Sequence, residues 1–265
     1  MKNGSMFLVS QGFSLFGLEI KWYGLIMAFA MVCGLLNAFW ICKIKNYNKN
    51  MPIDLVIAAI PCALVGARLY YCIFHGVNSF VEIFEVWKGG MAIYGGVIGG
   101  FLGICLCCLI KKYPLAQACD VAAPCLILGQ CIGRIGCYFA GCCYGIEVVN
   151  QAHQWFPFSV QIDGVWHYST FFFESFFNLI GYIVLMIVMK KTKPYGITTA
   201  SYLMFYGVVR SILEGFRGDS LYLFNTGIRV SQALSIVLVA VGLALLITII
   251  VLDRKKKKAG DKSNE

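Results

Sequence analysis

Residues 230–252 read VSQALSIVLVAVGLALLITIIVL and contain no charged side chain, and after Asp253 the chain continues with RKKKK at 254–258. An α-helix of this length spans the roughly 30 Å hydrocarbon core of a bilayer. Lysine and arginine collect at the cytoplasmic ends of membrane helices. The pattern therefore predicts a membrane helix near the C-terminus, with the basic tail in the cytoplasm.

Six further apolar runs precede this one, each close to the roughly 20 residues that a spanning helix needs. They lie at 20–41, 53–74, 91–110, 116–136, 171–189 and 197–214. Short basic segments follow the first, third, fifth and seventh runs, so the alternation places the N-terminus outside and the C-terminus in the cytoplasm. We predict an all-α integral membrane protein, a bundle of about seven transmembrane helices.

The composition supports a membrane protein and argues against a nucleic-acid partner. Of the 265 residues, 59% are hydrophobic and only 13% are charged, whereas a soluble domain carries about 25% charged residues. The formal net charge is +9, but the lysines and arginines follow apolar runs, where they set the orientation of the helices. We expect membrane lipids as partners and no nucleic acid.

No internal repeat or linker divides the chain before the basic tail. We predict one seven-helix transmembrane domain at 1–252, with outer loops near 141–170 and 215–229, and a disordered cytoplasmic tail at 253–265. The first outer loop is rich in aromatic residues, which suit the membrane–water boundary. The N-terminal residues lack the pattern of a cleavable signal peptide, so we expect the first helix to insert uncleaved.

Six ionisable residues lie inside the apolar runs or at their edges. They are Arg68, Asp120, Arg134, Glu174, Arg210 and Glu214. One charge at mid-bilayer costs about 2.5–3.5 kcal/mol, so this set requires a shared polar cavity and mutual pairing. Arg210 and Glu214 stand four residues apart on one helical face, a spacing that alone indicates a structural ion pair as readily as a functional one.

Three such arginines together favour the binding of a phosphate group. A planar guanidinium donates two parallel hydrogen bonds and does not lose its charge. The phosphate nearest at hand in a membrane belongs to a phospholipid. We therefore expect a phospholipid cavity at Arg68, Arg134 and Arg210 that opens toward the outer half of the bilayer.

Two glycine-rich segments adjoin these charges. Residues 89–100 read GGMAIYGGVIGG, which suits either close helix packing or the approach of backbone N–H groups to an anion. Residues 129–145 read GQCIGRIGCYFAGCCYG, and five glycines in seventeen residues weaken a helix. Unwound backbone at membrane depth is tolerated only against protein or a wet cavity, so this segment predicts such a cavity with Arg134 in it.

The thirteen cysteines lie mostly inside apolar runs, where a thiol packs as a small hydrophobe. Their odd number and the length of the chain argue against a disulfide framework. Cys137, Cys142 and Cys143 have a C-x4-C-C spacing that is unusual for zinc, and no histidine is close in the sequence. We predict no metal site and no cofactor.

These segments, in this order, resemble the prolipoprotein diacylglyceryl transferase family from about residue 15 to 252. The similarity is carried by Lys21-Trp22-Tyr23-Gly24, Gly66-Ala67-Arg68-Leu69-Tyr70-Tyr71, the run at 89–100, Asp120, Gly133-Arg134-Ile135-Gly136 and Tyr206-Gly207-Val208-Val209-Arg210-Ser211-Ile212-Leu213-Glu214. The resemblance implies a multi-pass transferase of the bacterial cytoplasmic membrane that acts in lipoprotein biogenesis. It moves the diacylglyceryl group of phosphatidylglycerol to the lipobox cysteine thiol of a prolipoprotein signal peptide, and these two molecules are the implied partners.

The resemblance also implies roles for individual residues. Arg134 and Arg210 would hold the phosphate and stabilise the leaving group, and Tyr94 and Tyr23 are the other catalytic candidates. Glu214 would orient Arg210. The expected substrate-binding residues are Arg68, Asp120, Glu214, Glu174, Gly95, Gly96, Gly133, Gly136, Cys137 and Cys142.

The chain departs from the family pattern at residues expected to take part in the chemistry. Tyr94 stands where many members have histidine, and a tyrosine with a pKa near 10 is a poor base. Cys137 and Cys142 stand where the family usually has asparagine and glutamate, and Tyr168-Ser169-Thr170 stands in place of the usual histidine–proline pair. The sequence thus predicts a divergent, cysteine-rich member with altered catalytic residues.

Two alternatives remain open at this point. The same fold can act on another thiol or alcohol acceptor, because function depends on the site and not on the fold. A non-catalytic lipid-binding or transport protein would also place charges inside a helix bundle. The lack of an inverted repeat argues against a transporter.

Overall fold

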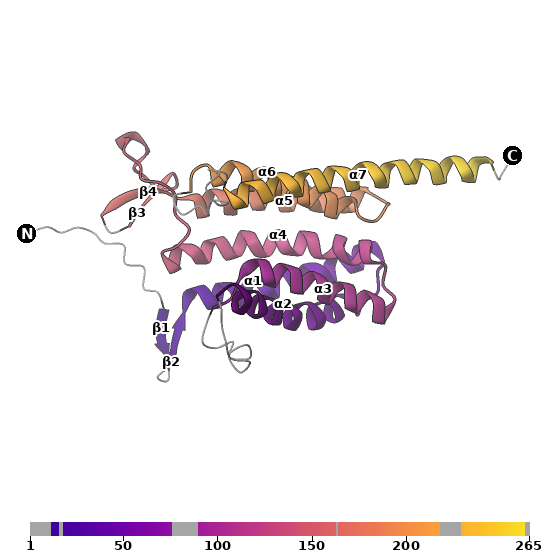
Figure 1. Cartoon of the computed structure of the whole chain (residues 1–265), viewed down its shortest axis with the longest axis horizontal. Coiled ribbons are helices and arrows are strands. Elements are labelled where there is room, and N and C mark those ends of the chain that lie inside the picture. Colours follow the sequence, from indigo (N-terminus) through magenta and orange to yellow (C-terminus); the bar gives the residue numbers. More distant parts are fainter. Residues whose placement is uncertain (1–11, 16–17, 76–89, 163, 218–228, 263–265) are drawn as a thin grey trace, which may run out of the picture. The chain divides into compact units, whose positions relative to one another are not determined.

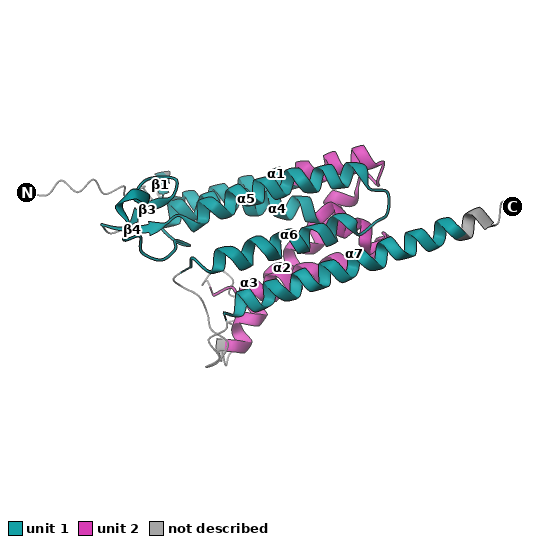
Figure 2. Ribbon diagram, turned by 90° about the horizontal axis from the view of Figure 1, so that it is seen from above, with its two compact units in different colours: residues 1–34, 123–265 teal, residues 35–122 magenta. Residues whose placement is uncertain are grey.

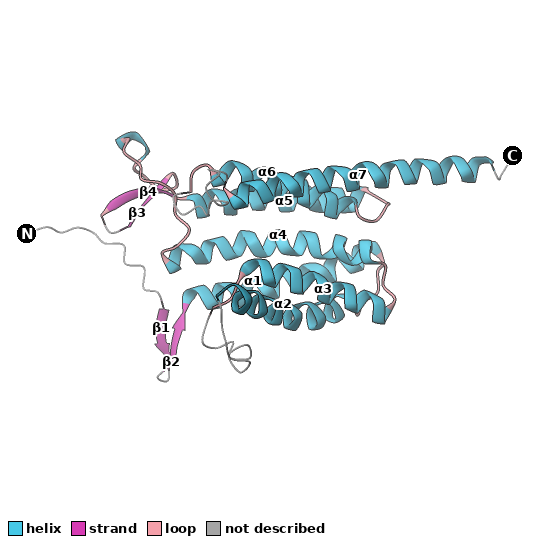
Figure 3. Cartoon of the chain, in the orientation of Figure 1, coloured by secondary structure: helices cyan, strands magenta, loops and turns pink. Residues whose placement is uncertain are grey.

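The computed structural model describes residues 12–15, 18–75, 90–162, 164–217 and 229–262. These residues form helices joined by short segments, with two antiparallel hairpins (Figures 1 and 3). The helices are α1 (Trp22–Lys45), α2 (Met51–His75), α3 (Ile93–Lys111), α4 (Leu115–Ala140), α5 (Thr170–Lys191), α6 (Ile197–Glu214) and α7 (Val230–Lys262). The prediction of an all-α membrane protein is therefore confirmed.

Among the described residues, six helices are long and apolar enough to cross a membrane. The exception is α6, which carries Thr198, Thr199 and Ser201 as well as the charged residues near its end. Its polar side chains lower its hydropathy, although it packs along α5 and α7 inside the bundle. The placement of the N-terminus outside and the C-terminus in the cytoplasm stays a prediction.

The described chain divides into two compact units, shown in two colours in Figure 2. The first unit consists of residues 1–34 and 123–265, and the second of residues 35–122. Helices α1 and α4 contribute residues to both units. The single domain at 1–252 stays a prediction.

In the second unit, α2 and α3 approach each other through glycines. A Cβ atom at Gly95 would overlap the Gly66 carbonyl, and one at Gly99 would overlap the Cys62 carbonyl. Backbones meet this closely in membranes only where side chains are absent. The geometry therefore supports helix packing as the role of Gly95 and Gly99, while Gly89 lies outside the described residues.

Replacing Gly99 by alanine should lower the thermal unfolding midpoint of the detergent-solubilised protein, because overpacking costs about 1–3 kcal/mol. Gly100→Ala is the matched control, since a Cβ atom there meets its nearest neighbour, the Ala63 Cβ, at an ordinary 3.5 Å. That control should match the parent or exceed it slightly, because alanine favours a helix by about 1 kcal/mol over glycine. Equal midpoints for the two variants would contradict the packing role of Gly99.

In the first unit, α4 is unbroken from residue 129 to Ala140 of the glycine-rich segment that was predicted to unwind, and the chain leaves the helix at Gly141. A Cβ atom at Gly133 would lie 3.1 Å from the Met27 Sδ, and one at Gly136 would lie 3.1 Å from the Tyr23 ring. These two glycines therefore admit α1 against α4. The prediction of unwound backbone was wrong for this stretch because tertiary packing compensates for the weak helix propensity of glycine.

Two hairpins precede α1 and α5 in the first unit. The hairpin of β1 (Gly12–Leu15) and β2 (Leu18–Lys21) leads into α1, and that of β3 (Ser159–Ile162) and β4 (Val165–Tyr168) leads into α5. The second hairpin lies within the predicted outer loop at 141–170. The other predicted loop, 215–229, is described only at Gly215–Arg217 and Arg229, so its remaining residues, 218–228, lie outside the described residues.

Helix α7 continues beyond the apolar run and through the basic cluster to Lys262. Residues 253–262 are therefore helical, and not disordered as the sequence predicted. Lys257 Nζ pairs with Asp253 Oδ2 at 2.7 Å, an i,i+4 arrangement that supports a helix at the surface. Lysine and arginine are also good helix formers. The prediction of disorder rested on the charged composition of the tail and did not take this propensity into account.

Candidate active site

Charged side chains from three helices meet at one end of the first unit. Arg134 lies six residues before the end of α4, Glu174 lies four residues after the start of α5, and Arg210 lies four residues before the end of α6. With a rise of 1.5 Å per residue, each lies within about 9 Å of its helix end. Because these ends alternate in direction along the chain, the three side chains come to the same end of the bundle.

Glu174 joins the two arginines. Its Oε1 lies 2.7 Å from Arg134 Nη2, and its Oε2 lies 3.4 Å from Arg210 Nη1. Arg210 Nη2 also pairs with Glu214 Oε2 at 2.9 Å, as the four-residue spacing predicted. Arg134, Glu174, Arg210 and Glu214 therefore form a chain of alternating charge, which we call the charge tetrad.

The tetrad exposes its arginines and buries its carboxylates. The side chains of Arg134 and Arg210 are 20% and 15% exposed, whereas those of Glu174 and Glu214 are 4% and 2% exposed. The carboxylates therefore hold the guanidinium groups from the buried side. An anion that reaches the tetrad meets guanidinium N–H groups first, which is the arrangement that phosphate binding requires.

Further polar contacts join the three helices to one another. Ser175 Oγ donates a hydrogen bond to the Cys131 carbonyl at 2.8 Å, which joins α5 to α4. Gln130 Nε2 donates to the Tyr202 hydroxyl at 3.0 Å, which joins α4 to α6. These contacts limit how far the backbones beneath the tetrad can shift, so the guanidinium groups are preorganised.

The segment after α4 contributes the Cys143 thiol and an open pocket beside the tetrad. Arg134 Nη1 donates to Cys143 Sγ at 3.5 Å. The hydrogen bond from Cys137 and the positive charges of Arg134 and Arg217 lower the pKa of Cys143 to about 5, against burial, which raises it. Residues 141–146 and His167 line a pocket of about 500 Å³. The segment after α4 therefore places a thiol of lowered pKa next to an arginine.

The first unit contains nine of the predicted site residues. Tyr23 is 42% exposed and its ring packs on Gly136, while Gly133 faces Met27 of the same helix α1. Cys137 and Cys142 lie at the end of α4, next to Cys143. The other members are the four residues of the charge tetrad.

Five predicted site residues belong to the second unit. Arg68 is buried, donates from Nη1 to the Gly90 carbonyl at 3.1 Å, and places its guanidinium carbon 5.6 Å from the centre of the Tyr71 ring. Tyr94 lies in the first turn of α3, with its ring centre 6.4 Å from that of Tyr70. The remaining members are Asp120, which is buried in α4, and Gly95 and Gly96 on α3.

Two residues that contact the tetrad in the first unit, Arg229 and Cys143, were not among the predicted site residues. Arg229 donates to the Glu214 carbonyl, which places a further cation at the tetrad. Cys143 accepts from Arg134, although only its two neighbours in the cysteine group were predicted as site residues. Cys143 could have been predicted from the sequence, because it is adjacent to Cys142, which was a predicted site residue. The position of Arg229 in the sequence gives no indication of its contact with Glu214.

Comparison with known proteins matches this chain to one family along most of its length. A family model described as prolipoprotein diacylglyceryl transferase matches residues 11–248. The phosphatidylglycerol–prolipoprotein diacylglyceryl transferase of Clostridium botulinum (strain Langeland) is 37% identical over 248 residues, which cover 91% of this chain and 95% of that protein. The similarly named protein 1 of Clostridium perfringens is 35% identical over 254 residues, 93% and 96% of the two chains. That of Finegoldia magna is 35% identical over 257 residues, 96% and 98%.

Proposed function

This chain belongs to the prolipoprotein diacylglyceryl transferase family, and on that premise we infer that it is a membrane transferase that moves the diacylglyceryl group of phosphatidylglycerol to prolipoproteins. We further propose that the acceptor is the thiol of the lipobox cysteine in the signal peptide. The reaction takes place on the outer side of the bacterial cytoplasmic membrane, where the end of the first unit with the tetrad is expected to lie. The expected alternatives, a non-catalytic lipid-binding protein among them, lose their support with family membership.

The observation that carries the proposal is the position of Glu174 between two partly exposed arginines. A buried charge group without a ligand role needs no exposed edge, since pairing alone satisfies it. Here both arginine side chains remain partly accessible while the carboxylates are buried. We propose that the phosphate of phosphatidylglycerol binds to the guanidinium groups of Arg134 and Arg210.

The reaction replaces a C–O bond of the lipid by a C–S bond to the acceptor. The acceptor sulfur attacks the terminal glycerol carbon of the diacylglyceryl group, a C–S bond forms, and the C–O bond to phosphate breaks. The thiol proton ends on the released glycerol phosphate or on solvent. The phosphodiester begins with one negative charge and the leaving monoester gains a second, so two fixed guanidinium groups stabilise the transition state more than the ground state.

The acceptor thiol must ionise before it attacks, because the thiolate is the nucleophile. We propose that the positive edges of Arg134 and Arg210 favour this ionisation, and that Tyr94 assists as a hydrogen-bond donor where many relatives have a histidine. Tyr23, which packs on Gly136 beside Arg134, belongs to the wall that receives the lipid. Arg68 and Asp120 of the second unit stay proposed substrate-binding residues on the strength of the family resemblance.

Replacing Tyr94 by phenylalanine tests the hydroxyl alone. We expect turnover to fall by about 10- to 100-fold, because a hydrogen bond to a charged group contributes about 1.5–3 kcal/mol. Tyr70→Phe is the matched control, since the two rings are neighbours in the same unit, and it should retain parental turnover. If Tyr94→Phe has the same turnover as the parent in steady-state assays, the hydroxyl has no part in catalysis and Tyr94 contributes only to packing.

The proposed function is tested by reconstitution. The purified full chain is placed in vesicles with phosphatidylglycerol and a lipobox peptide, and the expected products are glycerol phosphate and a peptide whose cysteine has gained the diacylglyceryl mass. Phosphatidylcholine vesicles and a peptide with serine in place of the cysteine are the controls for donor and acceptor. Neither product, with the Clostridium botulinum relative active alongside, would contradict the proposal.

A further inference from the structure

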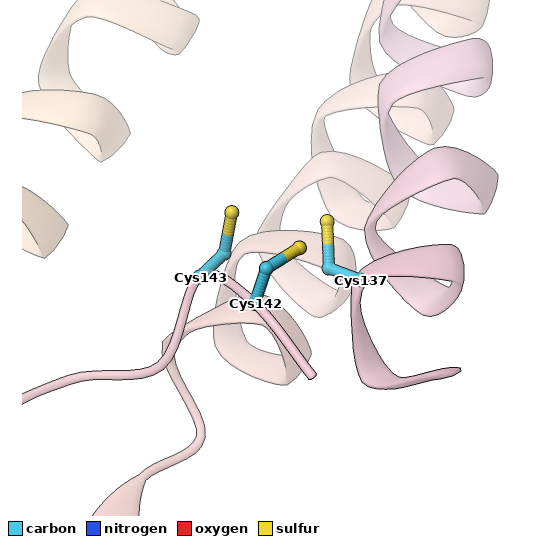
Figure 4. Close-up of side chains that lie close together, drawn as sticks. All are labelled: Cys137, Cys142 and Cys143. Atoms are coloured by element: carbon cyan, nitrogen blue, oxygen red, sulfur yellow. The ribbon is translucent and has the colours of Figure 1, made fainter. Parts of the chain in front are cut away.

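Three cysteine thiols converge at the end of α4. The sulfur atoms of Cys137, Cys142 and Cys143 all lie within 4.8 Å of one another. In Figure 4 the Cys142 sulfur points toward Cys137, and the Cys143 sulfur lies on the same side of the group. Cys137 is buried and the other two are partly exposed, so the group is reachable from one side.

The C-terminal cap of α4 explains why the unusual spacing brings these thiols together. The Cys142 N–H donates to the Cys137 carbonyl at 3.1 Å, the Gly141 N–H donates to the Tyr138 carbonyl at 3.3 Å, and Gly141 has a φ of +61°. These bonds define a Schellman motif, in which the second residue after the helix lies over the third residue from its end. A C-x4-C spacing at such a cap therefore places two sulfur atoms in contact without a zinc-finger loop.

Further contacts fix Cys143 and bring in a histidine. Thr170 Oγ1 donates to the Cys143 carbonyl at 2.7 Å, and the Gly145 N–H donates to the Tyr168 carbonyl at 2.8 Å. The second bond joins the segment after α4 to β4, which carries His167. His167 lines the same pocket as Cys142 and Cys143, although it follows them by more than twenty residues.

The hydrogen bond of His167 leaves one ring nitrogen available as a ligand. Its Nδ1 lies 3.1 Å from the Gly145 carbonyl, which can only accept, so Nδ1 carries the proton. The Nε2 atom then keeps its lone pair. A hydrogen bond from one ring nitrogen to a backbone carbonyl is the usual arrangement for a histidine that binds a metal through the other.

We propose that Cys137, Cys142 and Cys143 bind a thiophilic cation of the zinc class through their sulfur atoms. His167, which lines the same pocket but lies outside this group of three, is the proposed fourth ligand. Zn–S bonds of about 2.3 Å place sulfur atoms about 3.8 Å apart in a tetrahedron, so each separation of at most 4.8 Å shortens by no more than about 1 Å. Thiolate and imidazole ligands select zinc over magnesium or calcium. The sequence predicted no metal site, because the cysteine spacing is unusual for zinc and no histidine is close in the sequence. The helix cap at Gly141 and the hairpin that carries His167 could not be seen from that spacing.

Metal binding at these cysteines can be measured separately from lipid transfer. The ligands belong to the end of α4, the following segment and β4, and in the described part of the chain the hydrogen bond from Arg134 to Cys143 links them to the tetrad. A bound cation would hold the segment 141–145 and β4 to α4. The test therefore uses metal binding as its readout and not lipid transfer.

Cobalt(II) and then zinc(II) are added to the purified full chain in detergent, kept reduced with a phosphine. We expect one cobalt per chain, with thiolate-to-cobalt charge-transfer absorption that one equivalent of zinc removes. Cys142→Ser and Cys143→Ser should each weaken zinc binding by at least about 100-fold, and Cys125→Ser, another α4 cysteine, should bind as the parent does. His167→Asn should weaken binding while the charge-transfer band remains.

Three results would overturn the proposal. The first is no bound zinc in the parent when all thirteen thiols titrate as free. The second is a mass lower by about 2 Da without metal, which means a disulfide in place of the site. The third is stoichiometric zinc that Cys143→Ser leaves unchanged, which means adventitious binding. Thermal unfolding with and without zinc accompanies each variant, and only proteins with an intact site should be stabilised by the metal.

Discussion

Replacing Glu174 by glutamine lowers kcat/KM for diacylglyceryl transfer by at least about 100-fold. Glutamine keeps the size of the side chain but removes the negative charge that joins Arg134 to Arg210. Breaking a buried ion pair by removing one partner costs about 3–5 kcal/mol. If misplaced guanidinium groups raise the activation free energy by about 3 kcal/mol, the rate falls by about 100-fold, since 1.36 kcal/mol is a factor of ten.

Glu147→Gln is the matched control for this variant. Glu147 is exposed and lies in the segment that follows α4, so the same chemical change there removes no buried partner. Initial rates are measured in vesicles over a range of peptide concentrations, after a thermal unfolding scan has verified that each protein is folded. A folded Glu174→Gln protein with a rate within threefold of the parent would mean that the carboxylate does not position the arginines.

Replacing Arg210 by lysine should reduce kcat by a similar factor, although the positive charge is kept. Arg210 reaches Glu174 through Nη1 and Glu214 through Nη2 at the same time. A lysine ammonium is a single point charge and cannot hold both carboxylates while it also meets a phosphate. Because the guanidinium is proposed to stabilise the charge that grows on the leaving group, the loss should fall on kcat more than on KM.

The control for this change is Arg254→Lys, in the exposed basic stretch of α7. It should leave both kinetic constants within about twofold of the parent, the ordinary range for a surface substitution. Arg210→Lys with parental kcat would show that charge alone suffices at this position. The planar fork would then have no part in the mechanism.

The helices could be predicted from the sequence because hydrophobic length constrains them strongly. The third apolar run, 91–110, became α3 at Ile93–Lys111, and the fifth, 171–189, became α5 at Thr170–Lys191. A bilayer requires about 20 apolar residues per crossing, so composition alone locates each helix to within a few residues. The end of α7 was misjudged because a basic run can continue a helix into water.

The central contact of the site could not be predicted in the same way. Arg210 and Glu214 lie on one helix, and their pairing followed from a spacing of four. The partners of Glu174 lie 40 and 36 residues away, on other helices, so the bridge depends on how α4, α5 and α6 pack. The family resemblance named Glu174 as a site residue without giving its contacts.

The hairpin of β3 and β4 was overlooked although the sequence contains its signal. Ile162 pairs with Val165, the two residues between them in the sequence are Asp-Gly, and Gly164 has a φ of +85°. An Asp-Gly pair between apolar strands is the strongest local indication of a hairpin. The aromatic residues of this segment were interpreted as a loop at the membrane–water boundary. No hairpin was predicted, so His167 was not expected near the cysteines.

The central claim is that Arg134 and Arg210, joined by Glu174, hold the phosphate of phosphatidylglycerol. Its most direct test is the equilibrium dissociation constant of phosphatidylglycerol for the detergent-solubilised chain, measured by native mass spectrometry without any acceptor peptide. The parent should bind one lipid, and the Arg134→Ala and Arg210→Ala variants should each bind it at least about tenfold more weakly, the loss of one charge-assisted contact. Folded variants that bind phosphatidylglycerol as tightly as the parent does would contradict the claim.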